Sequence, residues 1–546
     1  MKIFKKYRAV LTPRQKSALK KERLMVILSG LLLGLSFPPF PVPVFIFFAF
    51  IPYFKVIENR NSLGEINRIS YLMNFVFSLV TLYWVGSWTK EADPFLMISG
   101  ALLLFVNPAL YLIPSTLYYF SKKTFGKKIS LLLFPFFWLA FEFLYSVTDL
   151  RFPWLALGNG VVKFNYFIQI ADIVGAYGLT LIILFINVFI YLSIKERGRN
   201  KKLFVYYSTA ASLVFIAVIV YGSLKVSSYE KSGKKIKVGL IQPDFNPWKK
   251  WEAGNLDEQL EIYLKLSEKA ARENAKLIVW PESALPVYLL SGNYENEVRK
   301  IHEFCDRNNV YLMTGMPDIN FFYEDDTVPE DAKQTAGGIK YTSYNSILFF
   351  SPFKRDVEKY AKIMLVPFGE RVPFLEELPL LDKLITWQVG ISSWNVGKEI
   401  KIFEPNKYFK VAGVICIESI YPYFVSKFVD KGAELIVVVT NDSWYGYSSG
   451  PFQHKEFAQL RAVENRRAVV RAANGGISCI IDPLGRTISQ TGLFERTYLA
   501  GNAELRNDKT FFTSYPLLFP SISLMISGIV IVMFLIKRVI KNEKSN

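Results

Sequence analysis

Two different hydrophobic patterns divide this chain. Long apolar runs follow one another through residues 24–224 and return at 517–536, whereas residues 225–510 carry short apolar runs between charged stretches. Most of the long runs reach or approach the roughly 20 residues that a helix needs to cross a bilayer. They lie at 24–39, 40–57, 71–88, 96–120, 129–147, 167–194, 203–224 and 517–536. The pattern predicts a polytopic α-helical membrane domain of about eight spans, seven in 24–224 and the eighth at 517–536.

Residues 225–510 show the alternation that is typical of an α/β domain. Short runs rich in Val and Ile, bounded by turn residues, predict strands. Charged stretches with helical spacing at 254–273, 293–308 and 452–467 separate several of them. The strand-like runs lie at 236–242, 275–280, 310–313, 346–350, 411–417, 435–440, 469–472 and 477–482. A segment of about 285 residues is long enough to bury its own core, so we expect a layered α/β domain between the last two membrane helices.

The basic residues give the predicted helices an orientation. Residues 1–23 hold nine Lys or Arg and one acid, and the other basic clusters fall on the same side of the helices. These clusters are Lys55, Arg60 and Arg68; Lys122, Lys123, Lys127 and Lys128; Lys195, Arg197, Arg199, Lys201 and Lys202; and Lys537, Arg538, Lys541 and Lys544. The loops at 89–95 and 148–166, on the other side, are poor in basic residues. Because Lys and Arg mark the cytoplasmic side, residues 1–23 and 537–546 are expected in the cytoplasm and residues 225–510 outside it.

This distribution explains the net charge of +18. A basic arm that binds nucleic acid is the alternative for residues 1–23, but this segment leads directly into an apolar run, which favours a cytoplasmic anchor. A cleaved signal peptide is disfavoured, because the charged start is long and no A-x-A site follows the run. The charge is mostly a signal of membrane topology, and no nucleic-acid partner is expected.

Composition limits the chemistry further. Hydrophobic residues make up 51% of the chain and the mean hydropathy is +0.22, which excludes a disordered or collagen-like protein. Three cysteines exclude a disulfide framework, and two histidines disfavour a metal site, so neither a metal nor a cofactor is expected. Cys305 and Cys479 suit small buried thiols better than a disulfide. His454, near the start of a predicted helix, is expected to make a structural hydrogen bond.

Reactive side chains lie at three places in the predicted α/β domain. Glu282 comes directly after one predicted strand, Cys416 lies at the end of another, and Lys362 lies between them in the sequence. In α/β domains reactive residues collect where strands end. A carboxylate can take the proton of a thiol, the thiolate can attack an acyl carbon, and an ammonium can stabilise the oxyanion that forms. Each residue taken alone also suits a structural role, since a lone Cys in an apolar strand is commonly a core residue.

Short motifs around these residues resemble those of the nitrilase superfamily, which uses a Glu–Lys–Cys triad on an α-β-β-α sandwich. They occur in the order and at the separations of that family. The motifs are W-P-E-S at 280–283, K-x-x-L-V-P-F-G-E at 362–370 and C-x-E-S at 416–419, with further likeness at 441–446, 461–465 and 471–476. The resemblance covers about 236–506. It implies that Glu282 is the general base, Lys362 the oxyanion partner and Cys416 the nucleophile.

A narrower resemblance extends over nearly the whole chain. The form L-V-P-F-G-E-x-V-P at 365–373, with membrane helices before and after the domain, is similar to the apolipoprotein N-acyltransferase family, a membrane-bound branch of the superfamily. The apolar region agrees with that family at 36–39, 138–142, 152–158 and 175–178.

This second resemblance implies further site residues. Glu370 and Glu418 would be supporting carboxylates that orient Lys362 or the incoming amine. Trp251 and Trp444 match aromatic residues of the family near the site, and Asn441 follows the strand that flanks it. These assignments rest on the matching motifs and not on spacing.

The activity that the resemblance implies is a two-step acyl transfer. A fatty acyl chain would pass from a phospholipid, expected to be phosphatidylethanolamine, to Cys416 as a thioester, and then to the α-amine of the S-diacylglyceryl cysteine that begins an apolipoprotein. Two large substrates that use one site imply ping-pong kinetics. The expected location is a bacterial inner membrane, with the catalytic domain in the periplasm and the protein acting as a monomer.

Two other functions fit parts of the pattern. A membrane-tethered amidase or nitrilase-type hydrolase would use the same triad with water as acceptor, although about eight spans exceed what a tether needs. A transporter with an external binding domain would carry charged residues deep in several spans. Glu142 and Asp172 are the main acids in the apolar runs, and both lie near their outer ends. Glu142 is therefore expected to serve in helix packing or head-group contact.

Overall fold

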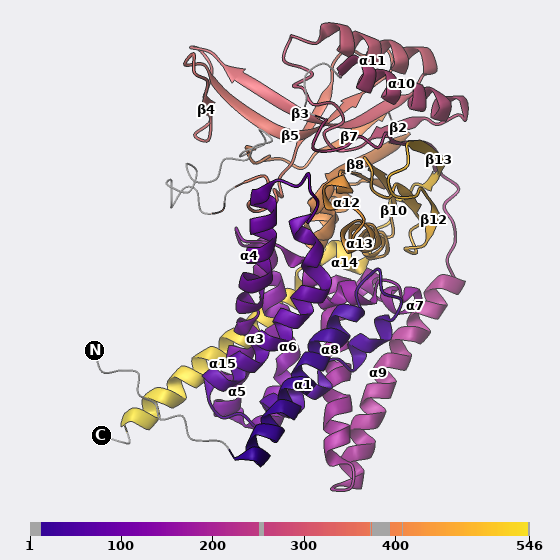
Figure 1. Ribbon diagram of the computed structural model, residues 1–546. Helices are drawn as coiled ribbons and strands as arrows, with labels where there is room; N and C mark the ends of the chain where they lie inside the picture. Colours follow the sequence, from indigo (N-terminus) through magenta and orange to yellow (C-terminus); the bar gives the residue numbers. More distant parts are fainter. Residues whose placement is uncertain (1–11, 251–255, 372, 374–393, 407, 544–546) are drawn as a thin grey trace.

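Helices occupy one half of the molecule and β-sheets the other (Figure 1). The computed structural model describes residues 12–250, 256–371, 373, 394–406 and 408–543. Most of the helices lie side by side as a bundle, and the sheets with their own helices lie on one end of it. The start of α1 and the end of α15 both lie at the opposite end of the bundle from the sheets (Figure 1).

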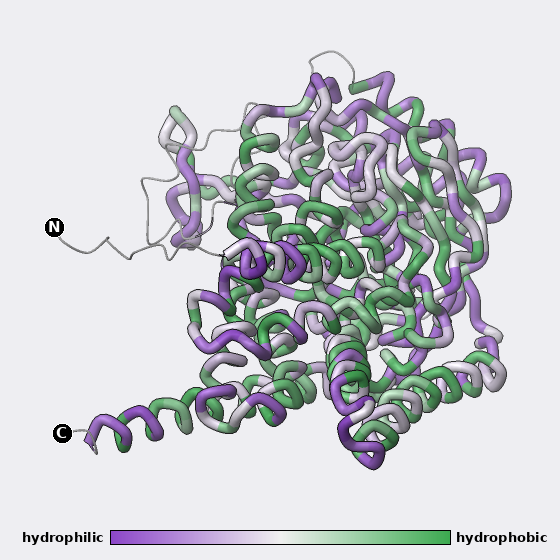
Figure 2. The backbone as a smooth tube through the Cα atoms, turned by 60° about the horizontal axis from the view of Figure 1, so that its bottom comes forward, coloured by the Kyte–Doolittle hydropathy of each residue, from purple (hydrophilic) through white to green (hydrophobic). Residues whose placement is uncertain are grey.

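Six of the described helical segments are long and apolar enough to cross a membrane. Hydrophobic residues follow much of their length (Figure 2). They are α3 (Leu63–Leu82) extended to Gly86, α4 (Pro94–Leu110) with α5 (Leu112–Phe125), α6 (Lys127–Val147), α8 (Ala171–Glu196), α9 (Lys201–Ser227) and α15 (Leu518–Glu543). The predicted membrane domain of apolar helices is thus confirmed, and its last helix follows the α/β part of the chain.

The first two predicted spans take other forms. The run 24–39 lies mostly in α1 (Pro13–Leu35), of which only the second half is apolar. Gly30 lets α1 approach α3 closely, because a Cβ there would lie 2.6 Å from the carbonyl oxygen of Met73. The run 40–57 is divided into a short 3-10 helix, η1 (Pro43–Phe47), and α2 (Ile51–Ile57), and a proline lies in the first turn of each. At about 1.5 Å per residue, neither of these two pieces is long enough to cross a bilayer.

The α/β part contains two sheets whose inner faces pack together. The first has the strand order β13-β1-β2-β3-β5-β4, with β6 also paired to β5, and the second has the order β12-β11-β10-β9-β8-β7. The strands of the first are β1 (Lys235–Gln242), β2 (Leu277–Trp280), β3 (Tyr311–Phe322), β4 (Lys333–Gln334), β5 (Lys340–Phe350), β6 (Glu358–Ala361) and β13 (Thr497–Glu504). Those of the second are β7 (Ile402–Asn406), β8 (Phe409–Ile415), β9 (Leu435–Thr440), β10 (Ala468–Ala473), β11 (Cys479–Ile481) and β12 (Thr487–Gln490). A Cβ at Gly413 of β8 would lie 2.6 Å from Ile347 of β5, which shows how closely the two faces meet.

Alternating side chains build the layers of this sandwich. In β2, Leu277 and Val279 join the core between the sheets, whereas Ile278 and Trp280 pack beneath α10 (Leu256–Arg272) and α11 (Glu295–Asn308). Two other helices, α12 (Pro422–Asp430) and α13 (Ser449–Asn465), pack on the second sheet. The order of layers is therefore α-β-β-α, as predicted.

Buried polar contacts fix the sandwich on the bundle. Glu464 of α13 accepts a hydrogen bond of 2.8 Å from the backbone nitrogen of Ala176, next to Gly175, which interrupts α8 with a φ of 64°. Arg466 follows α13, and its guanidinium lies 2.9 Å from the carboxylate of Asp172 at the start of α8. A charged pair and a charged hydrogen bond of this kind resist sliding of one half on the other. They hold α13, and the site beside it, at a set distance from the membrane helices.

Candidate active site

A cavity of about 140 Å³ brings the three predicted catalytic residues together. Glu282 follows β2, Lys362 follows β6 and Cys416 follows β8, so each comes directly or nearly so after a strand. The rest of the described lining is Leu96, Trp248, Lys250, Ser283, Asn345, Val366, Gly369, Glu370, Trp394, Asn441, Trp444 and Tyr445. Leu96 belongs to α4, so an apolar helix of the bundle forms part of the wall.

Lys362 lies between two carboxylates. Its ammonium is 3.2 Å from Glu282 and 2.8 Å from Glu370, and its side chain is 1% exposed. Asn345 of β5 donates a hydrogen bond of 2.8 Å to each of the same two carboxylates. Burial opposes the charge of Lys362, but Glu282 and Glu370 outweigh it and hold the pKa of its ammonium well above the usual range. The cavity therefore presents a cation flanked by two carboxylates.

Backbone contacts hold Glu282 in position. Its second carboxylate oxygen accepts a hydrogen bond of 3.1 Å from the backbone nitrogen of Asn441. The next residue, Ser283, has a φ of 49°, and Gly315 lies so close that a Cβ there would be 2.5 Å from the Cα of Glu282. The side-chain nitrogen of Lys250 donates a hydrogen bond to the carbonyl oxygen of Ser283. Glu282 and its backbone are thus held by neighbours on three other segments of the chain.

Cys416 occupies the sharp turn between β8 and a short 3-10 helix, η6 (Cys416–Ile420), and has a φ of 50°. A positive φ is unusual for a residue with a side chain and points to a position that the surroundings impose. Burial raises the pKa of the Cys416 thiol well above its usual range, Glu282 raises it further, and Lys362 offsets part of the increase. The thiol is therefore protonated at neutral pH and needs a base before it can attack.

A buried group of charges supports this turn from the side of α13. The Nε2 atom of His454 lies 3.1 Å from the carbonyl oxygen of Cys416 and 2.9 Å from the hydroxyl of Ser419. Its Nδ1 atom lies 2.9 Å from Asp442, which also contacts Arg471. Burial acts against the charge, but Arg471 and His454 hold the pKa of Asp442 well below its usual range. These contacts agree with the structural role predicted for His454.

Glu418 joins the backbone segments that carry the nucleophile and the cation. Its carboxylate accepts hydrogen bonds of 2.8 Å from the backbone nitrogen of Ile363 and 2.8 Å from that of Ile415. Tyr360 donates a further hydrogen bond of 2.8 Å. Burial raises the pKa of Glu418 to about 7, although these donors favour its ionised form. Glu418 therefore sets the spacing of the segments on either side of Lys362 and Cys416, while Glu370 contacts the ammonium itself.

The other predicted site residues fall into two groups. Asn441 and Trp444 line the cavity, whereas Trp251 lies outside the described residues. Sequence reasoning misses Lys250 and Asn345, which both contact the catalytic group or its backbone. Lys250 adjoins Trp251 in a short polar and aromatic segment that carries no strand or helix signal. Asn345 lies among the polar residues of β5, directly before the apolar run 346–350, and no pattern in the sequence singles it out.

The three described cysteines form no disulfide. Cys305, Cys416 and Cys479 all lie in the described part of the chain, and each is a free thiol. Within the residues that the structure describes, no group of three or more His, Cys, Asp or Glu side chains is placed to hold a metal ion.

Comparison with known families assigns both halves of the chain. Residues 237–505 match the carbon-nitrogen hydrolase family. Residues 29–189 match the apolipoprotein N-acyltransferase N-terminal domain. The first match spans the sandwich and the cavity residues that it contributes, and the second spans the bundle from α1 into α8.

Known relatives align along almost the whole chain. The sequence is 32% identical to the apolipoprotein N-acyltransferase of Chlorobaculum tepidum, over 94% of this chain and 96% of that one. It is 32% identical to that of Geobacter metallireducens, over 93% and 94% of the two chains. It is 30% identical to that of Aquifex aeolicus, over 88% and 97%. With relatives this similar over their full length, the chain belongs to the apolipoprotein N-acyltransferase family.

Proposed function

We propose that this protein transfers a fatty acyl chain from a phospholipid, through a thioester on Cys416, to the α-amine of the S-diacylglyceryl cysteine of an apolipoprotein. Membership of the family supports lipoprotein N-acylation. The observation that carries the mechanism is the cavity in which Glu282, Lys362 and Cys416 meet beside Leu96 of α4. A nucleophile whose pocket is walled by an apolar helix suits a donor that stays in the bilayer.

In the first half-reaction Glu282 takes the proton of the Cys416 thiol, and the thiolate attacks the ester carbon of the phospholipid. The developing oxyanion faces the Lys362 ammonium, which is 3.2 Å from Glu282. When the tetrahedral intermediate collapses, the bond between carbon and the glycerol oxygen breaks, and that oxygen takes the proton from Glu282. A lysophospholipid leaves and a thioester remains on Cys416.

In the second half-reaction the amine of the diacylglyceryl cysteine attacks the thioester carbon. Glu282 takes the amine proton, the carbon–sulfur bond breaks, and the proton passes to the Cys416 sulfur. The products are an amide and the free thiol, so the enzyme returns to its starting state. Cys416 is half-buried in a cavity that Trp444 and Tyr445 also line, and these rings limit access of water to the thioester until the amine arrives.

Several features support the finer assignments. The basic residues lie toward one end of the bundle and the sandwich toward the other, which supports a catalytic domain in the periplasm of a bacterial inner membrane and both chain ends in the cytoplasm. We also infer that the protein acts as a monomer. We assign phosphatidylethanolamine as the donor. The catalytic triad leaves a hydrolase as the competing activity, because water could take the place of the amine.

The test is transfer between defined lipids. Purified protein in mixed micelles is given phosphatidylethanolamine with one labelled acyl chain and a peptide that begins with S-diacylglyceryl cysteine. We expect label on the peptide amine, an equal amount of lysophospholipid, and neither product with Cys416→Ala. Release of label as free fatty acid, with an unchanged peptide, would show a hydrolase instead.

A further inference from the structure

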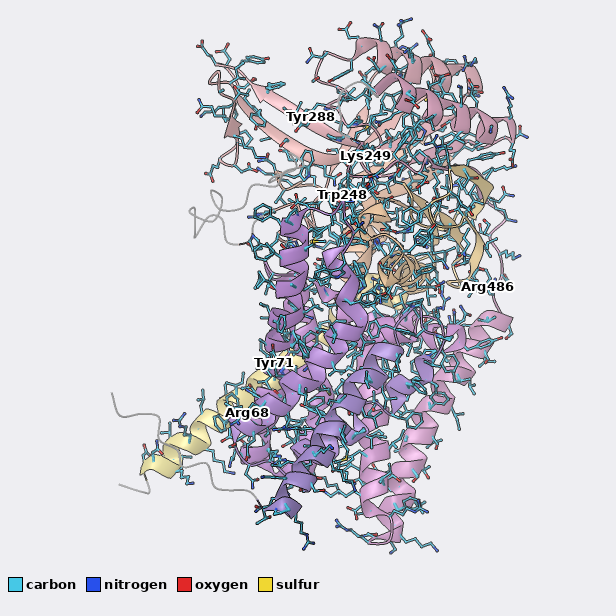
Figure 3. All side chains as sticks on the ribbon, in the orientation of Figure 1. Arg68, Tyr71, Trp248, Lys249, Tyr288 and Arg486 are labelled. Carbon is cyan, nitrogen blue, oxygen red and sulfur yellow. The ribbon has the colours of Figure 1, made fainter. Side chains whose placement is uncertain are left out.

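A second cavity, of about 460 Å³, adjoins the catalytic cavity and takes no part in the reaction described above. We refer to it as the side groove. Thr89, Lys90 and Glu91 line it from the connection between α3 and α4. From the sandwich its lining is Asp244, Phe245, Asn246, Pro247, Trp248, Ser443, Trp444 and Phe494. Figure 3 shows Trp248 and Lys249 where the sheets meet the upper end of α4.

The side groove and the catalytic cavity share a wall. Trp248 and Trp444 line both, and their rings meet edge to face with centroids 4.9 Å apart. The Ser87 hydroxyl donates a hydrogen bond of 2.6 Å to the Trp444 carbonyl oxygen, and the Asn246 side chain accepts one of 2.9 Å from the Trp248 backbone nitrogen. Asn246 also donates 2.8 Å to Glu91, so both halves of the molecule hold this wall. These two rings therefore lie between the cavity that holds Cys416 and the side groove.

The lining of the side groove suits a polypeptide better than a lipid head group. Beyond its contacts with Glu91 and Trp248, the Asn246 amide keeps one N–H and one lone pair, and the Ser443 hydroxyl, which accepts from Asn474 and Gly475, keeps its proton to donate, as a peptide backbone requires. Among the described lining residues Lys90 is the single cation, beside the carboxylates of Glu91 and Asp244. A phosphodiester is favoured by clusters of Arg or Lys, whereas the described lining holds one Lys, and the nearby Lys249 is paired with Glu91 at 3.8 Å.

The acceptor polypeptide needs a route from the catalytic cavity to water. Its amine must reach the thioester on Cys416 and its diacylglyceryl chains stay in the bilayer, while the polypeptide that follows the cysteine must leave toward water. We propose that the side groove binds the first residues of the acceptor polypeptide after its lipidated cysteine. This inference rests on the proposed function and adds to it a binding site for the protein part of the acceptor.

The experiment compares two acceptors. One is S-diacylglyceryl cysteine closed by a simple amide, and the other is the same cysteine followed by a long peptide. Lys90→Trp fills the side groove from an exposed position, and Lys354→Trp makes the same change at an exposed lysine elsewhere on the sandwich. We expect Lys90→Trp to lower kcat/KM for the long acceptor about tenfold, equal to about 1.4 kcal/mol, and to leave the short acceptor and the acyl-enzyme yield unchanged. Lys354→Trp should change neither.

A second variant, Lys90→Glu, tests the side groove by charge instead of by the size of the side chain. With Lys90→Glu, transfer should fall for long acceptors with acidic residues after the cysteine and rise for those with basic residues. Equal effects of Lys90→Trp on both acceptors would overturn the inference, as would an absence of any charge preference in Lys90→Glu. Loss of acyl-enzyme formation in Lys90→Trp would assign the side groove to the phospholipid head group. If the wild type acylates neither acceptor, the proposed function itself fails.

Discussion

Two buried carboxylates, one in the bundle and one in the sandwich, show how burial leads to different roles. Glu142 of α6 is 2% exposed and Glu282 is 7% exposed. Glu142 accepts hydrogen bonds of 2.9 Å from Trp138, 2.9 Å from the backbone of Leu157 and 2.8 Å from Thr180. All three donors are neutral and all belong to the bundle. Glu282 instead lies 3.2 Å from an ammonium and lines a cavity that also holds a thiol.

The two carboxylates differ in their surroundings: neutral donors enclose Glu142, whereas Glu282 has a charged partner and faces open space. Glu142 is surrounded by donors that join α6, α8 and the loop between them, so it stabilises the packing of these helices. Glu282 shares Lys362 with Glu370 and faces open space in the cavity. A buried charge with a charged partner and a free approach can change its protonation state during a reaction, whereas one that is enclosed by neutral donors serves the fold.

Removal of the shared cation should give the largest effect. Lys362→Met leaves Glu282 and Glu370 buried without an opposite charge, which costs about 3–5 kcal/mol of stability, and removes an oxyanion donor, which costs about 10²–10³ in kcat. We expect acyl transfer to fall about 10²–10³-fold, as measured by labelled acyl transfer, together with a lower thermal midpoint. The double variant Lys362→Met/Glu370→Gln should recover stability without activity. Retention of a tenth of the activity by Lys362→Met would contradict the role given to the cation.

Replacement by glutamine at Glu282 and at Glu142 tests most sharply how the two carboxylates differ. Glu282→Gln keeps size and hydrogen-bonding capacity but removes the base, so acyl-enzyme formation should fall about 10²-fold or more. The rate is read from lysophospholipid release in a single turnover. If Glu282→Gln forms the acyl-enzyme at the rate of the wild type, another group takes the thiol proton.

Lys250 should give a smaller effect. Burial lowers its pKa to about 7, although Glu282 opposes the shift. Lys250→Met loses the contact with Ser283, and kcat should fall about tenfold, or about 1.4 kcal/mol in the barrier.

Between pH 7 and the usual pKa of 10.5, the unfolded chain binds a proton at Lys250 that the folded protein lacks. Over that window the wild type should therefore gain stability relative to Lys250→Met as pH rises, by at most about 1.4 kcal/mol per pH unit. Thermal unfolding at a series of pH values measures this difference, and a constant difference would argue against a neutral Lys250.

Glu142→Gln should have the smallest effect. The glutamine oxygen can keep some of the three hydrogen bonds, so stability should fall by about 1 kcal/mol and acyl transfer should stay within about twofold of the wild type. The variant is also the matched control for Glu282→Gln. A large loss of transfer with an unchanged thermal midpoint would move Glu142 from packing to substrate contact.

Local pattern predicted much of the sandwich. All eight predicted strands fall on observed strands, because each is a short, largely apolar run bounded by turns. The pattern did not predict β13, which pairs with β1 along its whole length although more than 250 residues separate them. The predicted strand at 310–313 also ends too early, because pairing with β5 extends β3 through Pro317 and Asp318 to Phe322. Such strands depend on partners that are distant in the sequence, and local propensity carries no information about them.

The residues of the site also fall into those that sequence motifs indicate and those that only the fold brings into contact. Glu282, Lys362 and Cys416 lie in motifs that the sequence displays, and the fold brings them into one cavity. Lys250 and Asn345 act through contacts with residues that are distant in the chain, so spacing does not indicate them. The backbone role of Glu418 likewise becomes visible only when the segments at Ile363 and Ile415 are side by side.

The central claim is the thioester on Cys416, and intact mass measures it directly. Wild type and Cys416→Ala are incubated with phosphatidylethanolamine alone, and the diacylglyceryl cysteine peptide is added afterwards. The account predicts an acyl adduct on the wild type alone, which hydroxylamine removes and which passes to the peptide amine on its addition. Adducts on neither protein under any lipid condition, with the peptide still acylated by the wild type, would contradict a covalent mechanism and favour direct transfer between the two lipids.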